Sequence, residues 1–169
     1  MLIFCWFFLS VVKLTGTEET EREAVQNDNS GVSILKWMNE ESGEELFNID
    51  DIVRFDWDKQ IFELTCPAAM NFMAKLASVG VEGRKFIVKD GRSVIYKGTL
   101  VTPISSIACQ GPVIRDPILP DDIQPPLFKI GGGYPTYFEK GDMRFSERLK
   151  QALEQADMLG EIDVNNPPA

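Results

Sequence analysis

Four carboxylates fall within one short acidic stretch, at Asp50, Asp51, Asp56 and Asp58. Carboxylates this close in sequence could bind a metal ion or act as the acid and base of a glycosidase. A calcium loop needs alternating carboxylates around a Gly turn and a closing Glu, and the stretch lacks that pattern. Paired catalytic carboxylates can come from anywhere in a fold, so a hydrolase stays open. A solvated charged face is the ordinary explanation, and we predict no metal site.

Histidine is absent from all 169 residues. Ser-His-Asp and Cys-His catalysis need an imidazole that exchanges a proton near neutral pH, and most zinc sites use one as a ligand. A single copy of the chain therefore cannot form these sites. A nucleophile at Ser105 or Ser106 would need Lys or a carboxylate as its base, and neither serine begins a Ser-x-x-Lys motif. Their hydroxyls instead favour polar contacts to a ligand or partner, or a plain edge strand.

Three consecutive glycines, Gly131 to Gly133, suggest a phosphate-binding loop. They lack the Lys-Ser/Thr of a Walker loop, and the spacing of a dinucleotide-binding glycine motif fails at Thr136. Such glycines more often permit a tight turn, so we predict a loop there and no cofactor. An exposed aromatic residue on this loop, Tyr134, is a candidate binding contact. The predicted binding surface consists of exposed groups near Trp57, Ser105, Ser106 and Tyr134.

Two cysteines lie beyond the first residues of the chain, Cys66 and Cys109. In an exported protein an even pair can form a disulfide, so the sequence predicts either a disulfide or two buried free thiols. Cys66 lies at the expected start of a helix, where the helix dipole lowers a thiol pKa. Redox catalysis is still disfavoured, because the chain has no histidine and no CxxC motif.

The first residues, Met1 to Val12, are nearly all apolar, and a polar run starts at Thr17. The apolar run matches the length of a signal-peptide core and falls short of the roughly 20 residues that span a bilayer. No basic residue precedes the run and no clean cleavage site follows it, so a buried N-terminal element is the alternative. We predict export to the periplasm or the extracellular space, with membrane attachment only through an uncleaved signal. The expected organisation is a signal peptide at 1–16, a flexible tether at 17–31, one domain at 32–160 and a disordered tail at 161–169.

The formal net charge is -9, and the chain has no run of Lys or Arg. Nucleic-acid binding relies on a basic surface that neutralises phosphates, so we expect no nucleic-acid partner. Apolar residues make up 44% of the chain and charged residues 25%, proportions that are typical of a folded globular domain.

Local patterns predict one main helix after Thr65 and a second, amphipathic helix that ends near Leu159. The dipeptide Asp90-Gly91 between two β-prone runs predicts a hairpin. The expected fold class is α+β: a small mixed or antiparallel sheet with one helix packed on a face and a C-terminal amphipathic helix. The remaining expected segments are strands at 32–37, 60–64 and 127–130, an extended run at 100–108 and an irregular proline-rich segment at 112–126.

Part of the chain, from Ile61 to Val113, resembles the periplasmic head of SecD-type export subunits. In that family too, a strand ending in Leu-Thr-x-x-Ala leads into a helix and then into a hairpin carrying Asp-Gly. The corresponding residues here are Leu64, Thr65, Ala68 or Ala69, and Asp90-Gly91. The resemblance implies a similar small α+β subdomain on the outer side of a membrane, and it assigns no functional residue.

Three functions are consistent with these observations. The first is a non-catalytic exported domain that binds a protein or an envelope component. The second is a histidine-free hydrolase that uses paired carboxylates on a glycan-type substrate. The third is an accessory subunit of a membrane complex.

Overall fold

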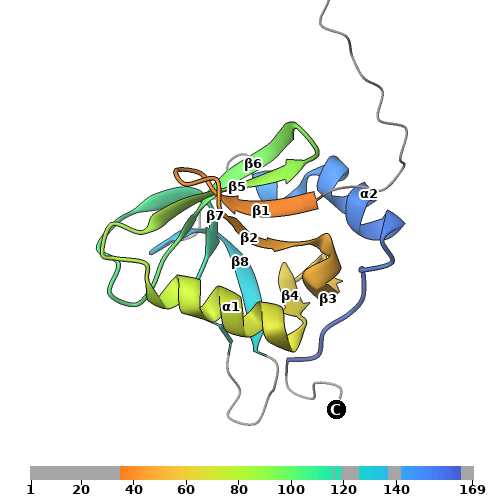
Figure 1. The fold of residues 1–169 in the computed structure, drawn as a ribbon, viewed down its shortest axis with the longest axis horizontal. Helices are drawn as coiled ribbons and strands as arrows, with labels where there is room; N and C mark the ends of the chain where they lie inside the picture. The colour runs from red at the N-terminus through yellow and green to blue at the C-terminus, as the bar shows by residue number, and fades with distance from the viewer. Residues whose placement is uncertain (1–34, 116, 119–125, 137–141, 165–169) are drawn as a thin grey trace, which may run out of the picture. The chain divides into compact units, whose positions relative to one another are not determined.

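The computed structural model describes residues 35–115, 117–118, 126–136 and 142–164 (Figure 1). The predicted signal and tether lie outside these residues. Within the described ranges the chain forms eight strands, two α-helices and two short 3-10 helices. In chain order they are β1 (Leu35–Asn39), β2 (Glu45–Asn48), η1 (Ile49–Asp51), β3 (Ile52–Asp56), β4 (Ile61–Leu64), α1 (Cys66–Ala77), β5 (Arg84–Asp90), β6 (Ser93–Leu100), β7 (Cys109–Ile114), β8 (Leu127–Tyr134), η2 (Met143–Phe145) and α2 (Glu147–Gln155).

All eight strands belong to one mixed sheet, in the order β2-β1-β5-β6-β7-β8-β4-β3. Neighbouring strands are antiparallel except β6 and β7, which are parallel. Antiparallel neighbours can be joined by short turns, as β5 and β6 are at Gly91. That glycine has a φ of +58°, a backbone conformation that favours glycine.

The sheet is curled, because its two end strands are neighbours in sequence. Only the three residues of η1 separate β2 from β3. Eight strands laid flat would place these ends about 34 Å apart at about 4.8 Å per strand. The chain from Asn48 to Ile52 can span at most about 14 Å. The sheet must therefore bend until β2 and β3 approach each other, with one face enclosing the core.

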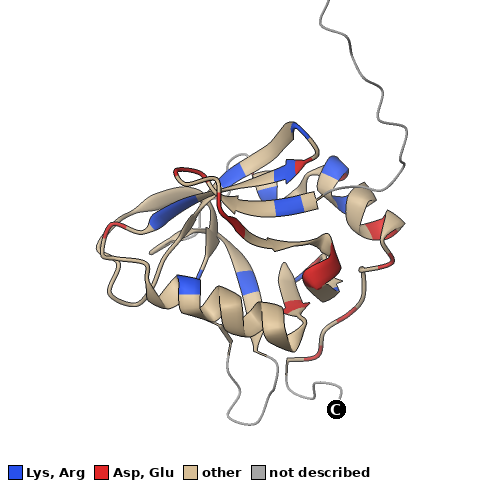
Figure 2. Ribbon diagram, in the orientation of Figure 1, with Lys and Arg blue, Asp and Glu red and all other residues tan. Residues whose placement is uncertain are grey.

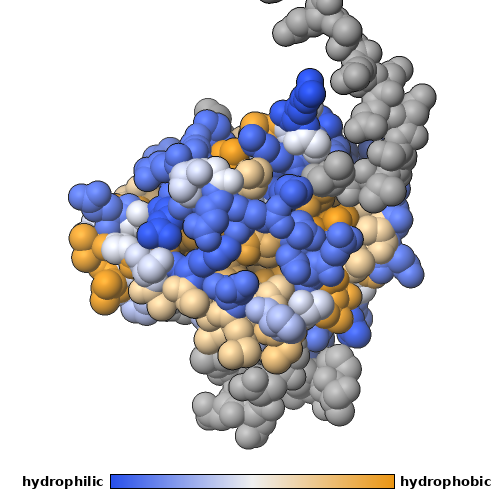
Figure 3. Space-filling model, in the orientation of Figure 1, coloured by the Kyte–Doolittle hydropathy of each residue, from blue (hydrophilic) through white to orange (hydrophobic). Residues whose placement is uncertain are grey.

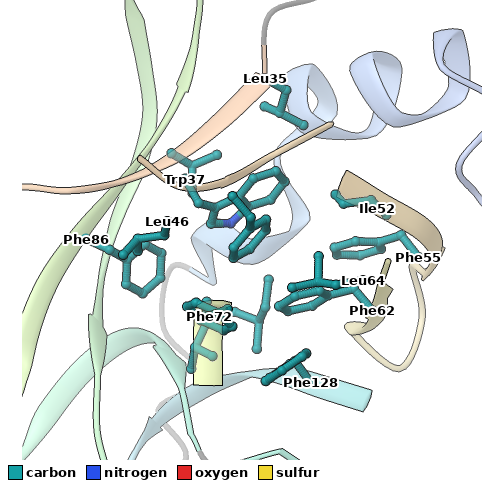
Figure 4. Packing of buried hydrophobic residues seen from close by; sticks show 14 of the residues in the cluster. Leu35, Trp37, Leu46, Ile52, Phe55, Phe62, Leu64, Phe72, Phe86 and Phe128 are labelled. Carbon is teal, nitrogen blue, oxygen red and sulfur yellow. The ribbon is translucent and has the colours of Figure 1, made fainter. Parts of the chain in front are cut away.

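Aromatic side chains fill the enclosed face (Figure 4). Phe47 of β2 stacks on Trp37 of β1 with 4.7 Å between ring centroids, and on Phe62 of β4 with 5.2 Å. The two ends of the sheet thus meet through one phenylalanine. Phe128 of β8 continues the stack, 5.5 Å from Phe62. Burial of several such rings is a large source of stability in a domain of this size.

Both α-helices contribute their apolar faces to this same core. The buried residues of α1 are Ala69, Phe72 and Leu76, which match the helical spacing of the sequence pattern. Those of α2 are Leu149, Ala152 and Leu153. Phe72 packs edge-on against both Phe47 and Phe128, so α1 lies against the concave side of the sheet. Neither helix has the length and apolar character needed to cross a bilayer, which holds for the described residues only.

The segment after α2 pairs with the free edge of β3. The backbone N–H of Phe55 donates to the carbonyl of Met158 (2.8 Å), and the N–H of Gly160 donates to the carbonyl of Phe55 (3.1 Å). Ile162 is buried beside Ile61 of β4. The described part of the predicted tail, residues 161–164, thus includes a buried apolar anchor.

Asp56 holds this C-terminal segment in place through hydrogen bonds. Its carboxylate accepts the N–H of Ile162 (2.9 Å) and the N–H of Lys59 (3.0 Å), and it pairs with the Lys59 ammonium at 3.1 Å. Burial alone would raise the pKa of Asp56, but these hydrogen bonds and the Lys59 charge together hold it below its ordinary value. The buried carboxylate is therefore ionised in the folded protein at neutral pH.

Replacing Asp56 by alanine is expected to lower the free energy of unfolding by about 2–3 kcal/mol at pH 7, because buried N–H groups lose a charged acceptor. The unfolded carboxyl has a pKa of about 3.9 and the folded one a lower value, so the unfolded chain binds this proton more tightly. The contribution is thus complete above about pH 5 and is lost as the pH falls through about 4 toward the folded pKa. Urea unfolding at pH 7 and pH 3 measures both effects.

The control for this experiment is Asp58→Ala, because Asp58 is an exposed neighbour of the same type. It should leave the free energy of unfolding within about 0.5 kcal/mol of the parent. A gap between Asp56→Ala and the parent that stays equally large at pH 3 would contradict the role given to the ionised carboxylate.

The predicted fold class is wrong. The chain forms one curled sheet of eight strands, and not a small sheet with one helix on a face. Three segments account for the difference: β2 was not predicted, β7 falls partly in the proline-rich segment, and β8 runs straight through Gly131 to Gly133. Those glycines pair with β7, for example Val113 with Gly131, and so form strand in place of the predicted loop.

Candidate functional site

Two loops lie side by side at one end of the sheet. Residues 101–108 connect β6 to β7, and residues 78–83 connect α1 to β5. The backbone N–H of Ser106 donates to the carbonyl of Val81 at 2.8 Å. The hydroxyl of Ser105 donates to the carbonyl of Gly80 at 3.4 Å. These bonds hold the two loops together.

The β6–β7 loop is an internally bonded turn. The N–H of Thr102 donates to the Ser105 hydroxyl oxygen (3.0 Å), and the N–H of Ser105 donates to the carbonyl of Thr102 (2.9 Å). Ser105 is only 7% exposed. Its hydroxyl therefore stabilises the loop, in the way that serine side chains commonly stabilise turns.

Tyr134 supports this loop from the end of β8. Its hydroxyl donates to the carbonyl of Ser105 at 3.2 Å. The guanidinium of Arg115 lies over the Tyr134 ring, 5.2 Å from its centroid, which is a cation–π distance. The half-buried ring packs on a small cluster beneath the loop, formed by Val101, Cys109 and Val113.

Close packing at Gly83 sets the position of the α1–β5 loop. This glycine has a φ of +67°. A Cβ there would lie 2.7 Å from Cδ1 of Ile107 and 2.9 Å from the carbonyl oxygen of Leu100. Both the backbone conformation and the space thus require glycine. The two loops are held as one rigid unit by packing as well as by hydrogen bonds.

The outer side of these loops presents apolar side chains to solvent. Val81 is 51% exposed and Ile104 is 66% exposed, and Pro103 and Ser106 beside them are exposed as well. In the space-filling view, hydrophobic residues gather at the left edge of the molecule, where these loops lie in Figure 1 (Figure 3). We call these four residues the apolar loop surface: Val81, Pro103, Ile104 and Ser106.

The structure brings together three of the four residues predicted to bind. Ser106 lies on the apolar loop surface, and Ser105 and Tyr134 lie beneath it as supports. Trp57 lies elsewhere, at the turn between β3 and β4. Its ring packs against Phe55 (6.2 Å) and edge-on against Phe145 (5.6 Å).

The sequence patterns did not single out Val81 or Ile104. Val81 follows Gly80 and Ile104 follows Pro103, so each is an apolar residue next to a turn-forming one. An apolar residue directly after Gly or Pro is a signal that could have identified both, because Gly and Pro favour turns and turns lie on the surface.

Two carboxylates of the acidic stretch, those of Asp51 and Asp56, accept hydrogen bonds from the backbone. Asp51 accepts the N–H of Asn48 (2.9 Å), and the side chain of Asn48 accepts the N–H of Asp50 (2.8 Å), which together form a capping box at η1. Asp56 fastens the C-terminal segment. In the described part of the chain, no three potential metal ligands lie close enough to share an ion.

Both cysteines carry free thiols in the structure. Cys66 is exposed at the first residue of α1, and Cys109 is buried at the first residue of β7. Neither predicted alternative describes both cysteines, because no disulfide joins them and only Cys109 is a buried free thiol.

Comparison with models of protein families, with curated proteins and with solved structures found no match to this chain.

Proposed function

We propose that this chain is an exported, non-catalytic binding module that recognises a protein or an envelope component through the apolar loop surface. The observation that carries the proposal is the exposure of Val81 and Ile104, each more than half exposed, on two loops joined by a 2.8 Å hydrogen bond. Binding residues commonly sit on loops that a rigid scaffold positions.

The rigidity of the loops favours recognition. A loop that is ordered before binding loses little conformational entropy when a partner docks, so more of the contact energy appears as affinity. The turn around Ser105, the support from Tyr134 and the packing at Gly83 all supply such order. Burial of an aliphatic side chain contributes about 1.5–3 kcal/mol, which two exposed residues could supply to an interface.

The chemistry of the surface supports binding more than catalysis. The polar groups here include the hydroxyl of Ser106, the exposed carboxylate of Glu82 and the guanidinium of Arg115 over the Tyr134 ring, and the chain has no histidine to serve as a base. Hydroxyl, carboxylate and guanidinium groups form hydrogen bonds with a peptide or a glycan. We therefore expect an apolar contact at Ile104 and Val81, with polar contacts at its rim.

A library of displayed peptides, selected on the folded chain, tests the proposal. Selected peptides are expected to lose at least tenfold in affinity on the variants Val81→Asp and Ile104→Asp, because a carboxylate would have to be desolvated at the contact. The matched control is Val53→Asp, since Val53 is 45% exposed on β3 and lies outside the loops. It should bind the same peptides as the parent.

Selected peptides that bind all three variants equally would contradict the proposed surface. Export is tested separately, by fractionating cells and measuring the mass of the mature chain. A full-length chain in the cytoplasm would contradict export and leave the peptide result unaffected.

A further inference from the structure

A cluster of basic residues lies on the outer face of β1, β5 and β6 and at the start of α2 (Figure 2). Burial alternates along β1, where Trp37 is buried and Lys36 is half-buried; in β5, Val88 is buried and its neighbour Lys89 is half-buried. The chain as a whole carries a net charge of -9, so this face stands out from the rest. We call its six cations the basic face: Lys36, Lys85, Lys89, Arg92, Lys97 and Arg148.

Nearby carboxylates neutralise half of the basic face. Lys36 pairs with Glu45 at 2.7 Å, Lys97 pairs with Glu40, and Arg148 pairs with Asp90 at 2.9 Å. The other three cations have no carboxylate partner among the described residues. Of these, the Lys85 ammonium donates to the Thr99 hydroxyl (2.9 Å), while Lys89 and Arg92 flank the tip of the β5–β6 hairpin.

The register of the strands places like charges together. Lys36 and Lys89 are direct partners across β1 and β5. Like charges directly opposite on one sheet face repel each other. Glu45 offsets the charge of Lys36, so Lys89 is the cation of this pair that an external anion could bind. One exposed apolar side chain accompanies the cations, because Val94 is the partner of Lys89 in β6 and is 47% exposed.

We infer that the basic face binds the anionic headgroups of a lipid membrane. Cations mixed with exposed apolar residues are typical of surfaces that lie on membranes. The chain enters the described domain at Leu35, next to Lys36, and the apolar run Met1 to Val12 precedes it. The inference rests on the predicted export of the chain, and it involves a different face from the apolar loop surface.

Charge repulsion would restrict how this acidic protein lies on an anionic membrane. The remaining surface carries the excess of Asp and Glu and is repelled by anionic lipid, so contact is expected only at the basic face. The tip of the β5–β6 hairpin, with Lys89, Arg92 and Val94, would then touch the headgroups.

Co-sedimentation of the full chain with lipid vesicles tests the inference. The vesicles are pure phosphatidylcholine, or phosphatidylcholine containing about one third phosphatidylserine. Binding is expected to be stronger to the anionic vesicles and to weaken as salt is raised. One cation near such a surface contributes about fivefold in affinity, so the charge reversal Lys89→Glu should lower it about 30-fold. Glutamate at this position faces Lys36, which favours folding.

The matched control is Lys129→Glu. Lys129 is an exposed lysine on β8 with no ion pair among the described residues, and its reversal changes the total charge equally. Its affinity should stay within twofold of the parent. Equal losses in both variants, or equal binding of the parent to both vesicles, would overturn the inference. Tighter binding to soluble polyglutamate than to anionic vesicles would also overturn it, in favour of an acidic peptide partner.

Discussion

Replacing Gly98 by alanine is expected to lower the free energy of unfolding by about 3 kcal/mol or more, through overpacking. A Cβ at this position would lie 2.3 Å from Cζ of Phe86 and 2.6 Å from the carbonyl oxygen of Pro112. Phe86 is fully buried and packs edge-on against Tyr96, and Pro112 presents backbone, so neither can move away freely. Thermal unfolding should shift down by about 10 °C.

Gly80→Ala is the control for this substitution. A Cβ at Gly80 meets no atom within 4 Å, and its backbone φ is not positive. Alanine there should be neutral or slightly stabilising, because it reduces the entropy of the unfolded chain. If both alanine variants unfolded at the parent temperature, the close contact of β6 with Phe86 would be refuted.

Truncation of Phe47 to alanine is expected to cost about 3–5 kcal/mol, the usual range for a buried phenylalanine. Its ring touches three others, those of Trp37, Phe62 and Phe72, which belong to β1, β4 and α1. The cavity would lie where the two ends of the curled sheet meet. Urea unfolding measures the loss, and hydrogen exchange should show that the amides of β2 lose protection first.

Phe145→Ala is the comparison for Phe47→Ala. Phe145 is 41% exposed and contacts Trp57 and Arg144 at the edge of the core. Its loss should cost only about 1 kcal/mol, because about two fifths of the residue already faces water and less apolar area is lost from the core. Equal costs for the two truncations would mean that Phe47 does not join the ends of the sheet.

Elements with strong local signals were predictable. The helix α1 begins after Thr65 as expected, and its buried residues, Ala69, Phe72 and Leu76, recur at helical spacing. The hairpin at Asp90-Gly91 is present, because a positive φ at Gly91 suits the turn between β5 and β6. These features depend on a few neighbouring residues, which the sequence displays directly.

The closure of the sheet was not predictable from local patterns. Glycine favours turns when it stands alone, so Gly131 to Gly133 suggested a loop, yet pairing with β7 makes them strand. The four residues of β2 show no alternation, and they are held at one end of the sheet by Phe47 in the shared core. Strand pairing in the first case and contacts within the shared core in the second decided the outcome, and local residue preferences did not.

The candidate site likewise has some features that the sequence predicted and others that only the structure revealed. The sequence by itself determined that a single chain has no histidine chemistry, and it identified Trp57, Ser105, Ser106 and Tyr134 as candidate binding residues. Only the tertiary structure decided that Ser105 and Tyr134 support a loop, that Val81 joins Ile104 on its surface, and that Trp57 belongs to a different contact. The composition of the chain determines which functional groups are available. Their exposure and their distances from one another depend on strand pairing and packing, which the neighbouring residues in sequence do not specify.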